Sequence, residues 1–162
     1  MATTLIIGYG NSTRGDDGIG WVAAERLAEE MSNPDVRILA CQQLALELAP
    51  ELSQVDRAIL IDAVRDGAAG RVRVERVEPT VSAPEPFSHD LDPATLVECA
   101  RTLYGRCPET WLVSVAGESF GFSDPLSASV AAAWPEVLTR VRELVEGQVQ
   151  SSFTSPANQV RL

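Results

Sequence analysis

Two adjacent carboxylates follow the first apolar run of the chain and could do chemistry there. The acidic segment from Gly8 to Gly20 joins an apolar run at 5–7 to an amphipathic stretch that begins at Ile19. This order predicts a buried strand, a glycine turn and then a helix. Asp16 and Asp17 would repel an anion at the helix N-terminus, so the loop suits a cation or a proton.

Two further side chains that could bind a metal or a proton follow later strands. Asp62 closes the apolar run at 58–61, and His89, the single histidine, ends a proline-rich loop at 79–89. Ligands of open α/β sheets bind beyond the carboxyl ends of the strands, so we expect Asp17, Asp62 and His89 to share a cleft. One imidazole and two carboxylates suit zinc, nickel or manganese, with positions left for water or substrate.

Each of these side chains also has a structural interpretation. Asp16 or Asp17 could cap the following helix, because Asp is strongly preferred at that position. Asp62 could bind loop amides, since a carboxylate that closes a buried strand must be solvated, paired or coordinated. A lone loop histidine is more often a surface residue than a ligand. Cys41 could be a nucleophile with His89 as its base, although a buried thiol is the better interpretation.

A nucleotide site is the main competing interpretation of the first loop. Gly8 and Gly10 supply the first two glycines of the dinucleotide-binding pattern G-x-G-x-x-G, but the third position holds Thr13. The adjacent acids would also oppose a pyrophosphate. The residues therefore disfavour nucleotide binding. Asn11 is expected to stabilise the glycine turn, because Asn bonds readily to its own loop.

Strand-length apolar runs alternate with helical patterns along the chain. The runs lie at 5–7, 36–39, 58–61, 72–77 and 111–115, and the helical patterns at 19–31, 44–52, 93–104 and 124–145. Asp92 is the expected N-cap of the third helix, and Pro135 is expected to kink or split the fourth. This pattern predicts a three-layer α/β/α fold with a mixed, mostly parallel five-stranded sheet. The link at 65–70 is too short for a crossover helix, so its two flanking strands are predicted to pair antiparallel.

Composition restricts the class of protein. The 162 residues predict one domain at 1–147, followed by a polar, unpatterned C-terminal tail at 148–162. A net charge of −10 argues against nucleic-acid and anionic-membrane partners. No apolar run approaches the roughly 20 residues of a membrane helix, and no signal peptide is evident, so a cytoplasmic location is expected. The three cysteines form no C-x-x-C pair, which indicates reduced thiols.

Taken in order, these motifs resemble those of the hydrogenase maturation endopeptidases, which trim the C-terminus of the large subunit of [NiFe] hydrogenases. The resemblance extends to about Val145. Three motifs in the same order carry it: Gly8-x-Gly10-Asn11 with Asp16-Asp17-Gly18-x-Gly20, then Ile61-Asp62-Ala63, then Ser88-His89 with Leu91. A departure follows the last strand, where Gly117-Glu118-Ser119-Phe120 replaces a more usual Glu-Pro pair.

The resemblance implies an endopeptidase that removes the C-terminal extension of a [NiFe] hydrogenase large-subunit precursor after nickel insertion. Asp17, Asp62 and His89 match the positions proposed to contact nickel already installed in the substrate and to carry the catalysis. The implied chemistry is metal-assisted attack of water, with a carboxylate taking the proton. Nickel would come with the substrate and bind the free protein weakly or not at all. The alternative is a non-catalytic, nickel-dependent checkpoint or chaperone that binds the same precursor.

Overall fold

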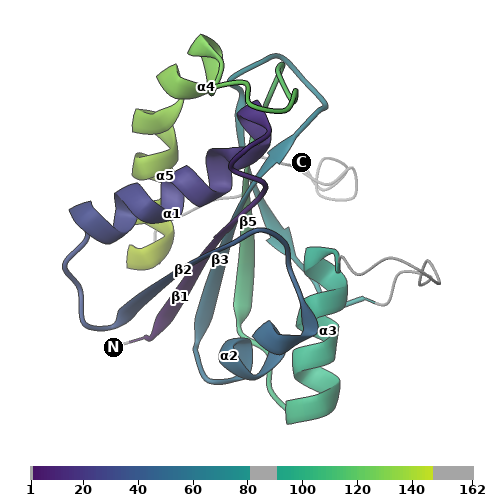
Figure 1. The fold of residues 1–162 in the computed structure, drawn as a ribbon. Coiled ribbons are helices and arrows are strands. Elements are labelled where there is room, and N and C mark those ends of the chain that lie inside the picture. Colours follow the sequence, from purple (N-terminus) through teal and green to yellow (C-terminus); the bar gives the residue numbers. More distant parts are fainter. Residues whose placement is uncertain (1, 81–90, 148–162) are drawn as a thin grey trace, which may run out of the picture.

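A twisted five-stranded sheet forms the middle layer of the protein (Figure 1). The computed structural model describes residues 2–80 and 91–147. The strand order is β2-β1-β3-β5-β4, and only β4 runs antiparallel to its neighbour. The strands are β1 (Thr4–Tyr9), β2 (Val36–Cys41), β3 (Arg57–Val64), β4 (Val72–Val77) and β5 (Glu109–Ala116).

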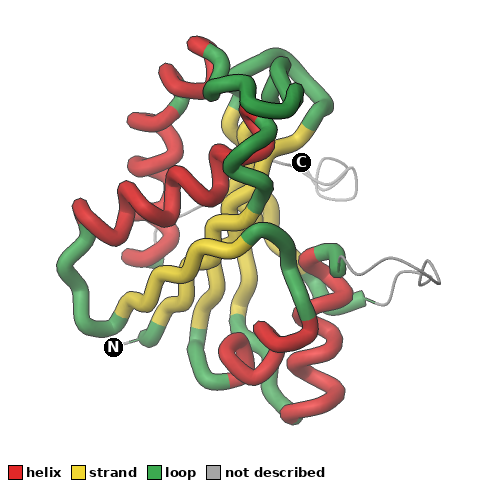
Figure 2. Tube along the Cα trace, viewed as in Figure 1, coloured by secondary structure: helices red, strands yellow, loops and turns green. Residues whose placement is uncertain are grey.

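Helices cover both faces of the sheet, which confirms the predicted three-layer fold (Figure 2). One face carries α1 (Ile19–Glu30), α4 (Ala128–Ala132) and α5 (Trp134–Glu146), and the other carries α2 (Ala49–Ser53) and α3 (Pro93–Tyr104). Two short 3-10 helices, η1 (Gly15–Gly18) and η2 (Leu46–Leu48), lie in the loops after β1 and β2. No helix of the described part is long and apolar enough to cross a membrane.

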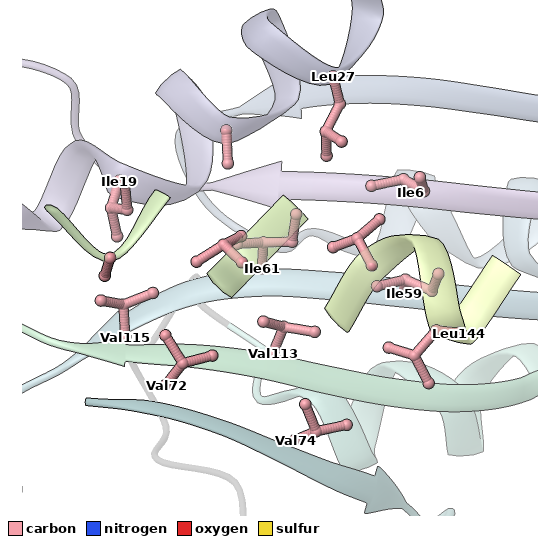
Figure 3. Close-up of a cluster of buried hydrophobic side chains, with 14 of the residues drawn as sticks. Ile6, Ile19, Leu27, Ile59, Ile61, Val72, Val74, Val113, Val115 and Leu144 are labelled. Atoms are coloured by element: carbon pink, nitrogen blue, oxygen red, sulfur yellow. The ribbon is translucent and has the colours of Figure 1, made fainter. Parts of the chain in front are cut away.

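Strand alternation divides the buried side chains between two cores. In β3, Ile59 and Ile61 point toward α1 and α5 and pack in the larger core (Figure 3). Ala58 and Leu60 point the other way, into the core under α2 and α3. Because successive strand residues face opposite sides, the same alternation places Asp62 on the α2 and α3 side. The strand that builds the core therefore also sets the direction of this carboxylate.

The predicted antiparallel pairing of the strands that flank residues 65–70 is wrong. β5 lies between β3 and β4, parallel to the former and antiparallel to the latter. The segment 65–71 arches over the end of β5, and Gly70 N donates to Ala116 O at 2.7 Å. β5 contributes apolar side chains to both cores, as a central strand does, whereas β4 carries Arg73, Glu75 and Arg76 and suits the edge.

The helix predictions were confirmed in part. The Asp92 side chain caps α3 by accepting a hydrogen bond from Thr95 N at 2.7 Å. Pro135 lies in the first turn of α5, and the predicted helix at 124–145 is split into α4 and α5. The helical pattern at 44–52 gives only η2 and the short α2. The predicted tail at 148–162 lies outside the described residues.

Candidate active site

A pocket of about 330 Å³ opens where β1, β2 and β3 end, on the face covered by α2 and α3. The end of each strand and the start of α3 contribute to its wall. The lining residues are Tyr9, Gly10, Asp17, Gln42, Gln43, Leu44, Asp62, Leu91, Asp92 and Pro93. The pocket therefore brings together Asp17 and Asp62, two of the three site residues predicted from the sequence.

The position of Asp62 follows from the parallel register of β1 and β3. Gly8 pairs with Ile61 in this register, so the next residues, Tyr9 and Asp62, are neighbours on adjacent strands. Both strands alternate in phase, and Tyr9 packs in the core under α2 and α3. The Tyr9 phenol and the Asp62 carboxylate therefore meet on the same face, at the floor of the pocket.

Burial of Asp62 changes its acid–base behaviour. Burial is the largest cause that raises the pKa of its carboxyl to about 6, and the nearby Asp17 carboxylate adds to the rise. Hydrogen bonds from the Ala63 amide, at 2.7 Å to Oδ1, and from Tyr9 oppose the rise but do not cancel it. A carboxyl group with this pKa exchanges protons near neutral pH, which is what general acid–base catalysis requires.

Tyr9 was not identified as a site residue from the sequence. Its side chain is 8% exposed. Burial, and after it the charge of Asp62, raises the pKa of its phenol far above the usual range. Tyr9 therefore stays protonated and can donate its hydrogen to the Asp62 carboxylate. The signal that could have revealed it is its position between Gly8 and Gly10, at the end of a strand predicted to run beside the strand of Asp62.

Asp17 is held at the pocket by the glycine turn. The Asn11 N–H donates to Asp17 Oδ2 at 2.8 Å. Gly10 has a φ of +146°, and a Cβ atom at this position would lie 1.9 Å from the Asp17 carbonyl oxygen. Only glycine allows this approach. The Asn11 side chain accepts hydrogen bonds from Thr13 N and Oγ1, which confirms its predicted role in stabilising the turn.

Asp16 has a structural role that differs from the role of its neighbour. Its side chain is fully buried and accepts hydrogen bonds from three backbone amides in the loop after β5, those of Glu118, Ser119 and Ser127, at 2.7–3.0 Å. Burial acts to raise the pKa of this carboxyl, but the amide hydrogen bonds outweigh it and lower the pKa below its usual value. Asp16 therefore ties the first loop to the loop after β5.

The helix-cap interpretation of these carboxylates is wrong. The N-cap of α1 is Gly18, and no side chain accepts a capping hydrogen bond there. The Asp16 carboxylate instead accepts hydrogen bonds from the backbone amides of Glu118 and Ser119. Both residues belong to the segment that replaces the Glu-Pro pair expected from the family resemblance. The departure at 117–120 thus leaves a loop that is anchored to the site through Asp16.

The third predicted site residue, His89, lies outside the described residues. The described chain resumes at Leu91, which lines the same pocket two residues further on. Across residues 2–80 and 91–147, no three His, Cys, Asp or Glu side chains form a group that could hold a metal ion. The assignment of Asp17, Asp62 and His89 to one metal-contacting set therefore stays a prediction.

The cysteines provide no competing nucleophile at the pocket. All three are free thiols, as expected from their number and spacing. Cys41 ends β2 but is not among the residues that line the pocket, and burial raises the pKa of its thiol. A raised pKa lowers the fraction of reactive thiolate, which argues against a nucleophilic role for this half-buried residue.

Comparison with known proteins identifies the fold. No protein-family model and no curated protein sequence matches the chain. The [NiFe] hydrogenase maturation protease HycI from Thermococcus kodakarensis superposes with a TM-score of 0.73 over 90% of this chain and 93% of its own, at 24% identity. HybD from the same organism, also a [NiFe] hydrogenase maturation protease, gives 0.68 over 88% and 98%, at 21%.

A third solved structure adds a modest likeness in sequence. The hydrogenase maturating endopeptidase HybD from Escherichia coli superposes with a TM-score of 0.72 over 92% of this chain and 96% of its own, at 26% identity. The coverage of both chains shows that the likeness extends across most of each chain. In fold, the chain is therefore similar to these hydrogenase maturation proteases.

Proposed function

We propose that the chain is an endopeptidase that removes the C-terminal extension of a [NiFe] hydrogenase large-subunit precursor after nickel insertion. The observation that carries the proposal is the pair of carboxylates, Asp17 and Asp62, in one pocket beyond the ends of β1 and β3. Support comes from the relatives of the same fold, which are described as hydrogenase maturation proteases and as a maturating endopeptidase. The precursor is accordingly the proposed partner of the chain.

Asp62 is the proposed general base and acid. Hydrolysis of a peptide bond requires a group that accepts a proton from the attacking water and returns one to the leaving amine. A pKa of about 6 allows Asp62 to exist in both forms near neutral pH. The Ala63 amide and the Tyr9 phenol hold the carboxylate, so its orientation does not depend on substrate.

Asp17 is the proposed second contact to the substrate. Its Oδ2 accepts the Asn11 N–H, while Oδ1 has no hydrogen bond to any side chain or amide in the described part of the chain. This oxygen is available to a ligand in the pocket. The close approach of Gly10 fixes the backbone of Asp17, so the carboxylate is positioned before substrate arrives.

Nickel is part of the substrate in this proposal, and Asp17, Asp62 and His89 would contact it. In that position the ion would polarise the scissile carbonyl or the attacking water. Two carboxylates and one imidazole, with no thiolate, fit a borderline ion but form a modest ligand set. We therefore propose that the free protein binds nickel weakly and that the precursor supplies the remaining ligands.

Cleavage by the purified protein tests this proposal. The nickel-loaded precursor is mixed with excess protein in a single turnover, and the released peptide is detected by mass spectrometry. The wild-type chain should shorten the precursor, and the Asp62→Asn variant should not. A stable complex that is never cleaved would instead identify the chain as a nickel-dependent checkpoint. Absence of both binding and cleavage would refute a role in maturation of that precursor.

A further inference from the structure

The outer edge of β2 is a row of backbone groups that ends at the pocket. β2 is an edge strand and pairs only with β1 in the described sheet. Hydrogen bonds at both ends of this pair define which groups face β1, because Thr4 N bonds to Asp35 O and Gly10 N bonds to Cys41 O. Strand periodicity then turns the N–H and C=O groups of Ile38 and Ala40 away from β1.

These outward groups have no partner in the part of the chain that the structure describes. The N–H of Val36, one position earlier in the same row, bonds to Asn33 O at 3.1 Å, whereas no backbone or side-chain group of the described residues bonds to Ile38 or Ala40 from outside. Ala40 is exposed. Two residues therefore present two donors and two acceptors in strand geometry, a pattern that pairs with an extended peptide.

The row leads directly into the pocket. Gln42 and Gln43 follow β2, line the pocket and are exposed, and neither carboxamide makes a hydrogen bond to another described residue. Each carboxamide offers both a donor and an acceptor, which matches the groups of a peptide backbone. Gln43 is followed by Leu44, a buried residue that also lines the pocket, so this turn is anchored in the core.

We propose that the outer edge of β2, together with Gln42 and Gln43, binds the substrate chain next to the scissile bond as an added strand. The inference rests on the proposed function, because that function requires an extended segment of the precursor to reach Asp17 and Asp62. Ile38 and Ala40 bind its backbone, and the two glutamines guide it over the ends of β2 and β1 into the pocket. Recognition through backbone groups is tolerant of substrate sequence, while the pocket selects the cleavage position.

A proline substitution tests the edge directly. Ala40→Pro removes the outward N–H without removing a hydrogen bond to β1, and proline is tolerated at such an edge position. Ala40→Val adds bulk but keeps the N–H, so the ratio of the two KM values isolates the backbone donor. We expect KM for the nickel-loaded precursor to be about tenfold higher for Ala40→Pro than for Ala40→Val, with similar kcat. Equal KM values for two folded variants would overturn the proposal.

Amide hydrogen exchange of the wild-type chain tests the same edge without substitution. The probe is a synthetic peptide that spans the cleavage junction of the precursor, added at millimolar concentration to isotope-labelled protein. Exchange should slow at Ile38 and Ala40, while Arg37 and Leu39, which already face β1, should not change. No protection at Ile38 and Ala40 would overturn the proposal.

Other occupants of the edge give different results in the exchange experiment. Protection of Ile38 and Ala40 in the free chain at every concentration would show that another part of the chain covers the edge, and protection that rises with protein concentration would show pairing with a second copy. Both results overturn the proposal. If wild-type protein cleaves the precursor but these edge tests fail, only this inference falls; if it cleaves no precursor, the proposed function falls first.

Discussion

Asp62→Asn is expected to stabilise the free protein while it abolishes cleavage. The folded protein raises the pKa of Asp62 from 3.8 to about 6, so the ionised form is disfavoured by roughly 2 pKa units, or about 3 kcal/mol. Asn removes the charge and keeps an oxygen that can accept the Ala63 N–H. Allowing for the partial exposure of the side chain, we expect a gain of about 2 kcal/mol at pH 7.5.

The pH dependence of this gain has a definite sign. Between pH 4 and 6 the folded state binds a proton at Asp62 that the unfolded state releases, so wild-type stability falls as pH rises through this window. The gain from Asp62→Asn should therefore be absent near pH 4, grow to its full size by about pH 6 and stay constant above it. For a protein of this size, about 2 kcal/mol corresponds to a Tm increase of about 4–8 °C.

Asp16→Asn is the matched control, because Asp16 is a buried carboxylate one residue from the site. Its oxygens accept three backbone amides, and an Asn side chain would turn its NH₂ group toward at least one of these donors. We expect a loss of about 3 kcal/mol at pH 7.5. Thermal unfolding followed by circular dichroism measures both variants. A fall in Tm for Asp62→Asn comparable to that for Asp16→Asn would refute the assignment of Asp62 as a functional carboxylate.

Further predictions concern the groups that orient the carboxylates. Tyr9→Phe keeps the buried ring but removes the hydrogen bond to Asp62, so kcat should fall about fivefold or more with KM nearly unchanged; a change in KM alone would contradict a positioning role. Gly10→Ala places a Cβ atom 1.9 Å from the Asp17 carbonyl, so Tm should fall by several degrees and activity should be lost; wild-type Tm would contradict the described turn. His89→Ala should leave circular dichroism and Tm unchanged and abolish processing, and processing at the wild-type rate would remove His89 from the site.

The features that depend on local pattern were predictable from the sequence. Apolar runs and helical periodicity gave the layers, and the Asp92-Pro93 pair gave the start of α3 at the correct residue. The meeting of Asp17 and Asp62 was also predictable, because both follow parallel strands and such strands end at one edge of a sheet.

The features that depend on distant partners were not predictable. Asp16 and Asp17 are adjacent and identical in type. Their roles differ because backbone amides in a loop more than 100 residues away donate hydrogen bonds to the Asp16 carboxylate. Likewise, the short link after β3 by itself favours a hairpin between β3 and β4. In the fold, β5 lies between these two strands, where its apolar side chains pack on both faces of the sheet. Tyr9 required the register of β1 and β3, which no single segment contains.

The most direct test of the central claim compares nickel-loaded and nickel-free precursor. Both are incubated with one preparation of the wild-type protein, in the presence of a chelator too weak to remove buried nickel, and the shortened product is measured over time. If the ion in the precursor completes a site begun by Asp17, Asp62 and His89, only the nickel-loaded precursor is cut. Equal cleavage rates on the two would contradict the account and would require a metal-independent role for these residues.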